Sequence, residues 1–488
     1  MRLPLSRFGC SQVRQILSAL LPLLLFLGLP ADAVAQPKSD TGGQSLQLSE
    51  VIESVRRSYP LIVAALADKR AAEGELQAAR GGFDPVLKTR GDITPIGAYP
   101  NGRFEIGVEQ PTPLWGAQLF AGYRVSVGDF PDYDGKLVTN QYGEARAGLM
   151  VPLLRNGPLD RRRASLRRAE ASVGIADASL AESRLAALRT GGIRYIDWVG
   201  AGLRKQIAES LLGLAVRRDE ALAVRVQRGD IPMIERIDNQ RALQQRQALL
   251  VLAQRGIVQN ALELSLFLRE GDGSPIIVGE SRLPSALPLP DRTDYGNPQQ
   301  ILSDQQTALQ KRPEPKRLQE QKRQLEVERD LAKNQLWPSA DLSAAVSQDF
   351  GPPGYPRDKT QLDLSLNLDI PTLNRAARGR LQQAEAALSK FLAQQRLVVD
   401  RINLEVADIH SLLSQAVSRV ALSDQEYKLA KQVEEAERAK FDLGDSTLLN
   451  VNLREQATFD AALRRVDALV EYHRAKISYQ TVLGHEEW

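Results

Sequence analysis

The chain has 488 residues, of which 43% are hydrophobic and only 5% aromatic, and its 63 Lys and Arg residues almost balance 60 Asp and Glu residues. This balance argues against a nucleic-acid-binding protein held by bulk charge. A single cysteine excludes a disulfide framework within the chain. With only three histidines, the chain also has too few ligands for a Cys/His metal centre, and we expect no metal and no cofactor.

The N-terminus has the pattern of a secretory signal peptide over residues 1–35. Three arginines precede an apolar run from Ile16 to Pro30, and Ala33-Val34-Ala35 supplies the small residues of a cleavage site. A membrane anchor is the alternative, but Pro22 interrupts the run, which is short for a membrane-spanning helix. Cleavage would also remove Cys10. We therefore expect an exported protein of a bacterial envelope whose mature form has no cysteine.

Two long stretches without proline, Leu159–Ile231 and Thr372–Trp488, predict two very long helices. From Ile409 to Phe441 apolar residues recur at alternating spacings of four and three, as in a coiled coil, with polar interruptions such as Glu434. The first helix alone would reach roughly 100 Å, although the Gly191-Gly192 pair allows a kink. A globular domain rarely holds such lengths, so we expect these helices to pack along each other or along other copies of the chain.

Each long helix is expected to end at a short turn and to be followed by a return helix. The two turns, Arg228–Pro232 and Leu443–Thr447, both contain a Gly-Asp pair. Glycine suits the left-handed position that closes a helix, and Asp, Ser or Thr can cap the next one. The return helices are expected to run to about Glu270 and Leu483.

Between the helices the hydrophobic period changes to two, which predicts β-strands. Leu362–Ile370 alternates apolar and polar residues without a fault, and Ala340–Gln348 is its expected partner. Further strands are expected in the first half, over residues 86–93, 104–109, 117–126 and 143–151.

Two kinds of structure fit this alternation. One is an antiparallel sheet on a soluble core, which the periodicity alone favours; the other is a membrane barrel with lipid outside and a polar lumen. Residues 83–152 and 336–371 hold 12 of the 26 aromatic residues. Tyr and Trp near strand ends are typical of the interfacial girdles of barrels. This enrichment favours the barrel, although strands attract aromatic residues in any protein.

The chain is an internal duplication, because landmarks recur in one order in both halves. Pro60 and Pro313 each stand 25 residues before a second proline, Pro85 or Pro338, that turns the chain from helix to strand. Each half then continues with strands, a long helix, a turn and a return helix. We expect a first repeat over residues 36–270 (strands about 83–152, helical hairpin about 159–270), a proline-rich connection over 271–298, and a second repeat over 299–488 (strands about 339–371, hairpin about 374–483).

With these landmarks the chain resembles the TolC-like outer-membrane efflux proteins from about Leu46 to Gly484. No single motif is specific, but the ordered set is. The segments that carry the resemblance are Tyr59-Pro60-Leu61 and Arg312-Pro313-Glu314 at the start of each half, Gln335–Ser339 entering a strand, Val151–Arg155 leaving the sheet, and the turns that begin at Gly229 and Gly444.

The resemblance implies a mainly α fold with membrane β, in which the duplicated helix–strands–long helix–return helix unit forms a trimeric β-barrel and a periplasmic coiled-coil tunnel. It implies a homotrimer in the outer membrane of a Gram-negative bacterium. As a passive channel of a tripartite efflux or type I secretion system, this homotrimer would have outer-membrane lipid, a periplasmic adaptor (membrane fusion protein) and an inner-membrane pump as partners. Segment 99–142 either extends the barrel or forms surface loops. A periplasmic coiled-coil scaffold or adaptor with a soluble β domain is the alternative function.

The resemblance also places a periplasmic entrance at the two turns. In the family, the residue six positions after the turn glycine is often Asp and helps to set the entrance; here these positions are Glu235 and Asn450, and Asn450 argues against a cation-binding ring. The entrance charge is then expected from Asp230, Glu235 and Asp445, with Arg228 or Arg236 as partners. Helix capping is an equal alternative for Asp230 and Asp445.

A second group of candidate residues follows the last strand of the first half. Arg161, Arg162 and Arg163 are expected to meet lipid phosphates at the inner edge of the membrane, with a solvated helix face as an equal alternative. The three histidines have no nucleophile or carboxylate at a catalytic spacing, so we expect no enzymatic activity.

Overall fold

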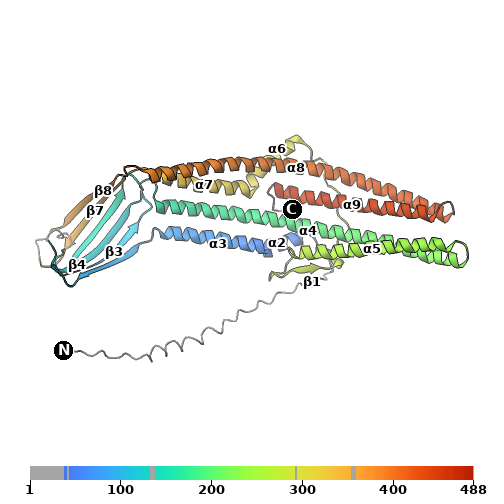
Figure 1. Ribbon diagram of the computed structural model, residues 1–488, viewed down its shortest axis with the longest axis horizontal. Helices are drawn as coiled ribbons and strands as arrows, with labels where there is room; N and C mark the ends of the chain where they lie inside the picture. Colours follow the sequence, from blue (N-terminus) through green and yellow to red (C-terminus); the bar gives the residue numbers. More distant parts are fainter. Residues whose placement is uncertain (1–37, 41–42, 132–137, 292–293, 353–358, 487–488) are drawn as a thin grey trace, which may run out of the picture.

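The computed structural model describes residues 38–40, 43–131, 138–291, 294–352 and 359–486, so the expected signal peptide over 1–35 lies outside the described residues. The molecule is elongated, with a β-sheet at one end of a bundle of long helices (Figure 1). The sheet strands run obliquely to the helix axes.

The first half contributes four helices and four sheet strands: α2 (Leu48–Ser58), α3 (Pro60–Gly81), β2 (Val86–Thr94), β3 (Asn101–Pro111), β4 (Gln118–Gly128), β5 (Glu144–Pro152), α4 (Arg161–Gln227) and α5 (Met233–Ser265). Pro60 begins α3, where its fixed φ suits a helix and its missing N–H costs nothing. Asp160 caps α4, since its carboxylate accepts a hydrogen bond of 2.8 Å from the backbone N–H of Arg163.

The second half follows the same order with two strands instead of four: α6 (Pro298–Lys311), α7 (Pro313–Asn334), β7 (Ser339–Asp349), β8 (Gln361–Asp369), α8 (Arg375–Asp442) and α9 (Leu448–Val482). In addition, β1 (Lys38–Asp40) pairs in parallel with β6 (Ile276–Val278) beside the middle of the bundle.

The two longest helices, α4 and α8, have 67 and 68 residues and run without a break. The Gly191-Gly192 pair does not interrupt α4. An added Cβ at Gly191 would lie only 3.0 Å from the Val55 side chain and 3.3 Å from that of Phe267. Glycine at this position therefore allows close packing of α4 against its neighbours.

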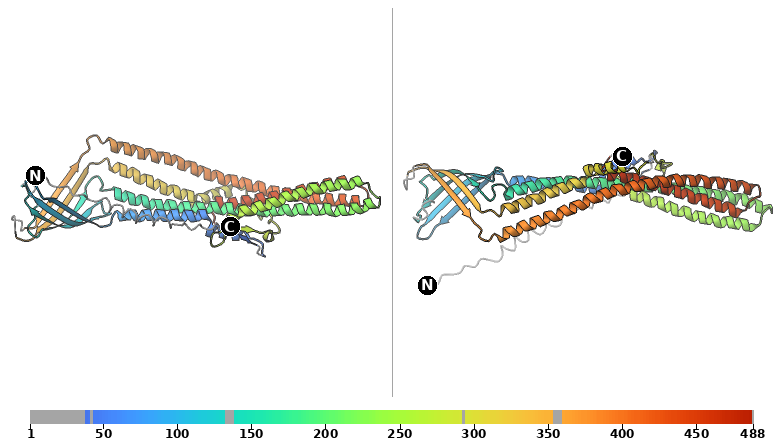
Figure 2. Two further views of the ribbon diagram at one scale, coloured as in Figure 1. Left: turned by 60° about the horizontal axis from the view of Figure 1, so that its bottom comes forward. Right: turned by 90° about the horizontal axis from the view of Figure 1, so that it is seen from above.

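The helices are arranged differently on the two sides of the middle of the molecule (Figure 2). On the sheet side, α3, α4, α7 and α8 lie in this order, each packed on the next. On the far side, the hairpins α4/α5 and α8/α9 lie together, with α4 against α9. The main hydrophobic core is between these regions and contains the fully buried Trp198 and Tyr472. In the part of the chain that is described, no helix is both long and apolar enough to cross a membrane.

The sheet has six strands in the order β2-β3-β4-β5-β7-β8, and every neighbouring pair is antiparallel. The pairing of β5 with β7 joins the two halves of the chain. Because β3 and β4 lie inside this sheet, half of segment 99–142 extends the sheet. The first half thus supplies four strands and the second half two.

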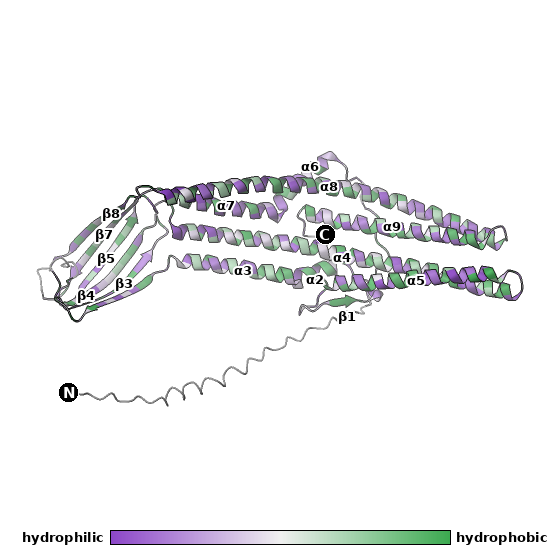
Figure 3. Ribbon diagram, in the orientation of Figure 1, coloured by the Kyte–Doolittle hydropathy of each residue, from purple (hydrophilic) through white to green (hydrophobic). Residues whose placement is uncertain are grey.

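One face of the sheet is apolar and exposed. The strand registers place alternate residues of all six strands on this face, and Figure 3 shows the hydrophobic bands across the strands. Its large exposed side chains are Leu87, Ile93, Phe104, Ile106, Val108, Leu119, Tyr123, Val127, Leu149, Leu342, Val346, Leu362, Leu364, Leu366 and Leu368. No described helix packs against this face. A soluble domain would bury such a surface.

The opposite face of the sheet is polar and carries cross-strand ion pairs. Lys88 pairs with Glu109 at 2.6 Å, and Arg103 pairs with Asp92 at 2.8 Å. Arg124 also pairs with Glu144, and the guanidinium of Arg146 lies over the Phe120 ring, 5.4 Å from its centroid. Cross-strand pairs of opposite charge stabilise a sheet and tolerate water on that face.

Candidate functional site

The two turns at the far end of the helices have the same backbone geometry. Gly229 and Gly444 have φ of 80° and 88°. The N–H of Asp230 donates to the carbonyl of Arg225, and the N–H of Asp445 donates to that of Lys440, each at 2.9 Å. These are the bonds of a Schellman motif, which requires a left-handed residue that glycine adopts without strain.

The predicted ion pairs between charged residues of the turns are not present within one chain. In the described part of the molecule, the side chains of Arg228, Asp230, Glu235 and Asp445 make no ion pair. Arg236 instead pairs with Asp219 of α4, at 3.3 Å. A charged entrance built from these residues stays a prediction, because it depends on other copies of the chain.

The capping alternative for the two aspartates is wrong. The N-cap of α5 is Pro232, and that of α9 is Thr447, whose hydroxyl accepts a hydrogen bond from the N–H of Asn450. Asp230 and Asp445 therefore have exposed carboxylates that are free of helix-capping bonds.

The turns of both halves lie side by side and share a hollow of about 400 Å³. Ile234, Glu235 and Asp238 of the first half line it, together with Phe441 and Leu449 of the second. Glu235 is half-buried there. Of the predicted entrance residues, Glu235 is the one that lines this hollow between the two hairpins.

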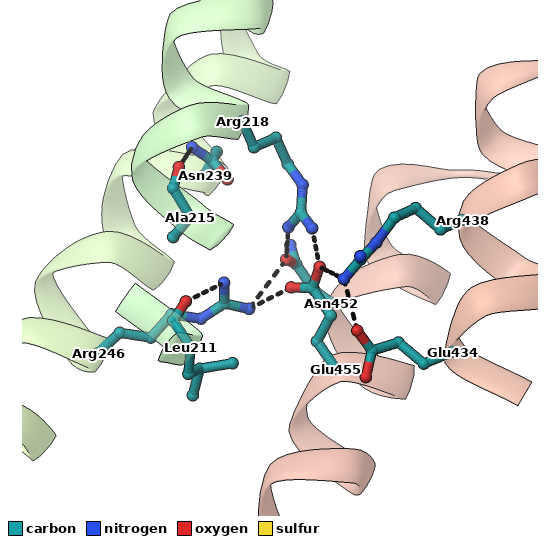
Figure 4. A network of polar contacts seen from close by, with 9 residues as sticks. All are labelled: Leu211, Ala215, Arg218, Asn239, Arg246, Glu434, Arg438, Asn452 and Glu455. Atoms are coloured by element: carbon teal, nitrogen blue, oxygen red, sulfur yellow. Dashed lines mark hydrogen bonds and ion pairs between the residues drawn. The ribbon is translucent and has the colours of Figure 1, made fainter. Parts of the chain in front are cut away.

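A buried network of charges ties the two hairpins together a few helical turns from these loops (Figure 4). Its centre is Glu455 of α9, which is 1% exposed. Arg218 of α4 and Arg246 of α5 approach this carboxylate from the first half, Arg246 at 2.8 Å. Arg438 of α8 reaches it at 3.1 Å and also pairs with Glu434.

Hydrogen bonds complete this network. The side-chain oxygen of Asn452 accepts from Arg218 at 2.7 Å, and the carbonyl of Leu211 accepts from Arg246 at 3.4 Å. Burial by itself raises the pKa of Glu455, but the charges of Arg218 and Arg246 outweigh it and hold this pKa below its ordinary value. Glu455 is therefore ionised at neutral pH. It joins four helices that belong to both halves of the chain.

No pattern in the sequence identified Glu455 in advance. The available signal was Glu434, a polar residue in the apolar seam of α8, which lies beside a groove of about 260 Å³ with Glu455, Arg438 and Tyr427 in its wall. Such an interruption indicates that a charged partner is near, but it does not identify the helix that supplies the partner.

His410 also gains partners that sequence spacing did not predict. It is fully buried, with Nε2 2.9 Å from the carboxylate of Asp304 and Nδ1 2.6 Å from the carbonyl oxygen of Tyr295. The hydroxyl of Tyr479 donates to the same carboxylate at 2.6 Å. These bonds join α6 and the connecting segment to α8 and α9, and we assign them a structural role.

The three arginines after the sheet have different surroundings. Arg163 donates to the carbonyl oxygens of Asn156 and Gly157 at 2.6 and 2.9 Å and pairs with Asp160, so it stabilises the junction of β5 and α4. Arg161 and Arg162 are exposed.

Arg161 and Arg162 line a hollow of about 700 Å³ at the end of the sheet. Gln118 and Asp341 line it too, and the register places both on the polar face. Contact of Arg161 and Arg162 with lipid phosphates stays a prediction.

No family model matches the sequence, and no curated protein matches it. Solved structures do match. The outer membrane channel CmeC of Campylobacter jejuni is 11% identical, with a TM-score of 0.63 over 90% of this chain and 85% of its own. The outer membrane protein VceC of Vibrio cholerae is 15% identical, with a TM-score of 0.63 over 90% and 96% of the two chains.

A third match is the MtrE outer membrane channel of Neisseria gonorrhoeae, solved in an open state. It is 14% identical, with a TM-score of 0.61 over 93% of this chain and 96% of its own. At these identities the likeness concerns the fold. Because it covers sheet and helices together, this chain has the fold of the TolC-like outer-membrane channels, as its sequence landmarks predicted.

Proposed function

We propose that this chain is the subunit of a homotrimeric outer-membrane channel, which carries solutes passively from the periplasm and an inner-membrane pump to the cell exterior. The observation that carries this proposal is the uncovered apolar face of the sheet, located at one end of helices that are about 100 Å long. Lipid is the partner that such a face requires. The fold shared with solved outer-membrane channels supports the same function.

The proposed setting is a tripartite efflux or type I secretion system of a Gram-negative bacterium. The signal peptide over residues 1–35 would direct export, and the helices would extend into the periplasm. The hairpin turns would then meet a periplasmic adaptor and the pump, which supplies the energy. The alternative, a periplasmic scaffold or adaptor with a soluble β domain, would need a protein partner over the whole apolar face.

Membrane fractionation tests this function. The full-length protein is expressed in a Gram-negative host, and its outer membranes are washed with urea and then extracted with detergent. We expect heat-sensitive trimers that resist the urea wash and conduct ions in planar bilayers. A monomer released by urea would refute the channel and support the scaffold.

We further propose that the turns with Arg228, Asp230, Glu235, Arg236, Asp445 and Asn450 form the periplasmic entrance. Threefold repetition would amplify any charge at this position, so that a few residues form a ring. Glu235 is the best test because it lies in the hollow between the two turns. Glu235→Ala is expected to raise the conductance of trimers in planar bilayers. The control Glu220→Ala changes an exposed acid of α4 outside this hollow. Equal conductance of Glu235→Ala, the control and the unchanged protein would remove Glu235 from the entrance.

A further inference from the structure

The sheet ends in two strands, β2 and β8, that have no outer neighbour among the described residues. Every residue of β8 is exposed, whichever face of the sheet its side chain lies on, and so is every residue of β2 except one. Each strand offers a full row of backbone N–H and C=O groups. Open edges of this kind are not tolerated in hydrocarbon, because each unpaired group costs several kcal/mol. The two edges therefore need strand partners in the membrane.

The strand directions allow the two edges to serve each other. With six alternating strands, β2 and β8 point in opposite directions. A β8 strand can thus join the β2 strand of a second copy as another antiparallel neighbour. An odd number of strands would have forced a parallel junction.

The strands of the sheet are staggered by the amount that gives the strand tilt of a closed barrel. One row of paired residues runs from Val86, the first residue of β2, through Glu109, Phe120, Gly148 and Ala345 to Asp363. Asp363 lies six residues from Asp369, where β8 ends at the same edge of the sheet. Six residues at about 3.4 Å over five strand spacings of about 4.8 Å give a tilt of about 40°. Barrel strands tilt by about 35–45°.

The circumference of such a barrel can be compared with that of the ring of helices that three subunits would form next to it. Eighteen strands at this tilt occupy a circumference of about 113 Å. Three copies of α3, α4, α7 and α8 make twelve helices, which at about 9.5 Å between axes occupy about 114 Å. Six strands for each subunit therefore match the four helices beneath them.

We propose that three copies close an 18-stranded barrel, in which β8 of each subunit pairs with β2 of the next, so that β3 and β4 are part of the barrel wall. This inference rests on the trimeric channel proposed above. It adds the number of strands and the pair of edges that forms the subunit interface. With a backbone diameter of about 36 Å, such a barrel leaves an aqueous passage, as porins of 16–18 strands do.

The alternation of side chains restricts the register at this interface. We assume that the register shifts between β8 and the β2 of the next subunit by the same amount as between neighbouring strands within one subunit. Leu366 of β8 then lies beside residues 89–91 of that β2. Leu366 lies on the apolar face, and its neighbour must lie there too. Its partner is therefore Thr89 or Gly91 of the partner subunit, since residue 90 faces the polar side.

Cysteine cross-linking in outer membranes tests this interface. The mature chain would have no cysteine, because Cys10 belongs to the expected signal peptide. Leu366→Cys is combined with Thr89→Cys or with Gly91→Cys, oxidised in the membrane and run on non-reducing gels. The matched control replaces Ser365 instead of Leu366, which puts the two thiols on opposite faces, beyond the Cβ separation of about 4 Å that a disulfide needs.

We expect a covalent trimer from at least one Leu366→Cys pair, none from the Ser365→Cys controls, and a return to monomers after reduction. A cross-link of Leu366→Cys to Tyr123→Cys of β4 would overturn the proposal, because the barrel wall would then omit β2 and β3. Intact outer-membrane trimers that form no Leu366→Cys cross-link to β2 would also overturn it but leave the channel function standing. A urea-soluble monomer would refute both.

Discussion

Replacing Glu455 by glutamine should loosen the contact between the two hairpins of each subunit. The substitution keeps the shape and one accepting oxygen but removes the charge that faces Arg218 and Arg246. The side chains of these two arginines are only 11% and 5% exposed. Breaking a buried ion pair costs about 3–5 kcal/mol, since it leaves a charge uncompensated. We expect about 3 kcal/mol, because Asn452 still accepts hydrogen bonds from both arginines.

Hydrogen exchange of the detergent-solubilised protein measures this loss locally. A change of 3 kcal/mol raises the exchange of amides protected by the hairpin contact on the order of 100-fold. The control is Glu426→Gln, which breaks an ion pair with Arg464 at 2.7 Å in the same hairpin, where both side chains are about half exposed. Such a surface pair is worth at most about 1 kcal/mol. If Glu455→Gln exchanges no faster than Glu426→Gln, the network does not hold the hairpins together.

The same network predicts a pH dependence. Because the folded-state pKa of Glu455 lies below its usual value of 4.5, its contribution is complete above about pH 4.5. It is lost as the pH falls through the lower folded-state pKa. The difference in thermal stability between the unchanged protein and Glu455→Gln should stay constant from pH 8 to 5 and shrink below pH 4. A difference that shrinks between pH 8 and 6 would contradict this assignment.

Two further substitutions test the membrane face and the packing of α4. Leu366→Arg should cost about 2–4 kcal/mol near the middle of the membrane and reduce heat-sensitive trimers on gels, whereas Asn367→Arg on the polar face should leave them intact; equal loss in both variants would refute the assignment of faces. Gly202→Leu should destabilise the fold by about 1–3 kcal/mol in thermal unfolding, because an added Cβ would lie 2.4 Å from the Leu283 side chain. Gly213→Leu, which meets only the end of Arg217 at 3.6 Å, is its control, and an equal effect of the two leucines would reject this packing argument.

The local patterns of the sequence predicted the elements of the fold well. The absence of proline between Leu159 and Ile231 indicated α4, which begins at Arg161 and ends at Gln227. The alternation in Leu362–Ile370 indicated both β8 and its apolar face. Both signals depend only on neighbours in the chain, since a helix excludes proline and a two-faced strand repeats every second residue.

The contacts between distant segments could not be predicted in this way. Pairing of β5 with β7 joins residues about 200 positions apart, and no local signal specifies it. Glu455 meets arginines from three other helices, a meeting that depends on how the hairpins pack. For the same reason the sequence suggested loop partners for Arg236, whereas the hairpin brings Asp219 within its reach.

The Glu455 network also bears on the history of the duplication. When Gly229 is aligned with Gly444, the residue of the first half that corresponds to Glu455 is Gln240, and the one that corresponds to Arg246 is Ala461. An assembly of six identical half-chains would therefore lack either Glu455 or the two arginines of the first half, Arg218 and Arg246, that approach it. The network requires two halves that differ at these positions. The two hairpins of each subunit are therefore bound to each other through unlike residues, and they are not interchangeable.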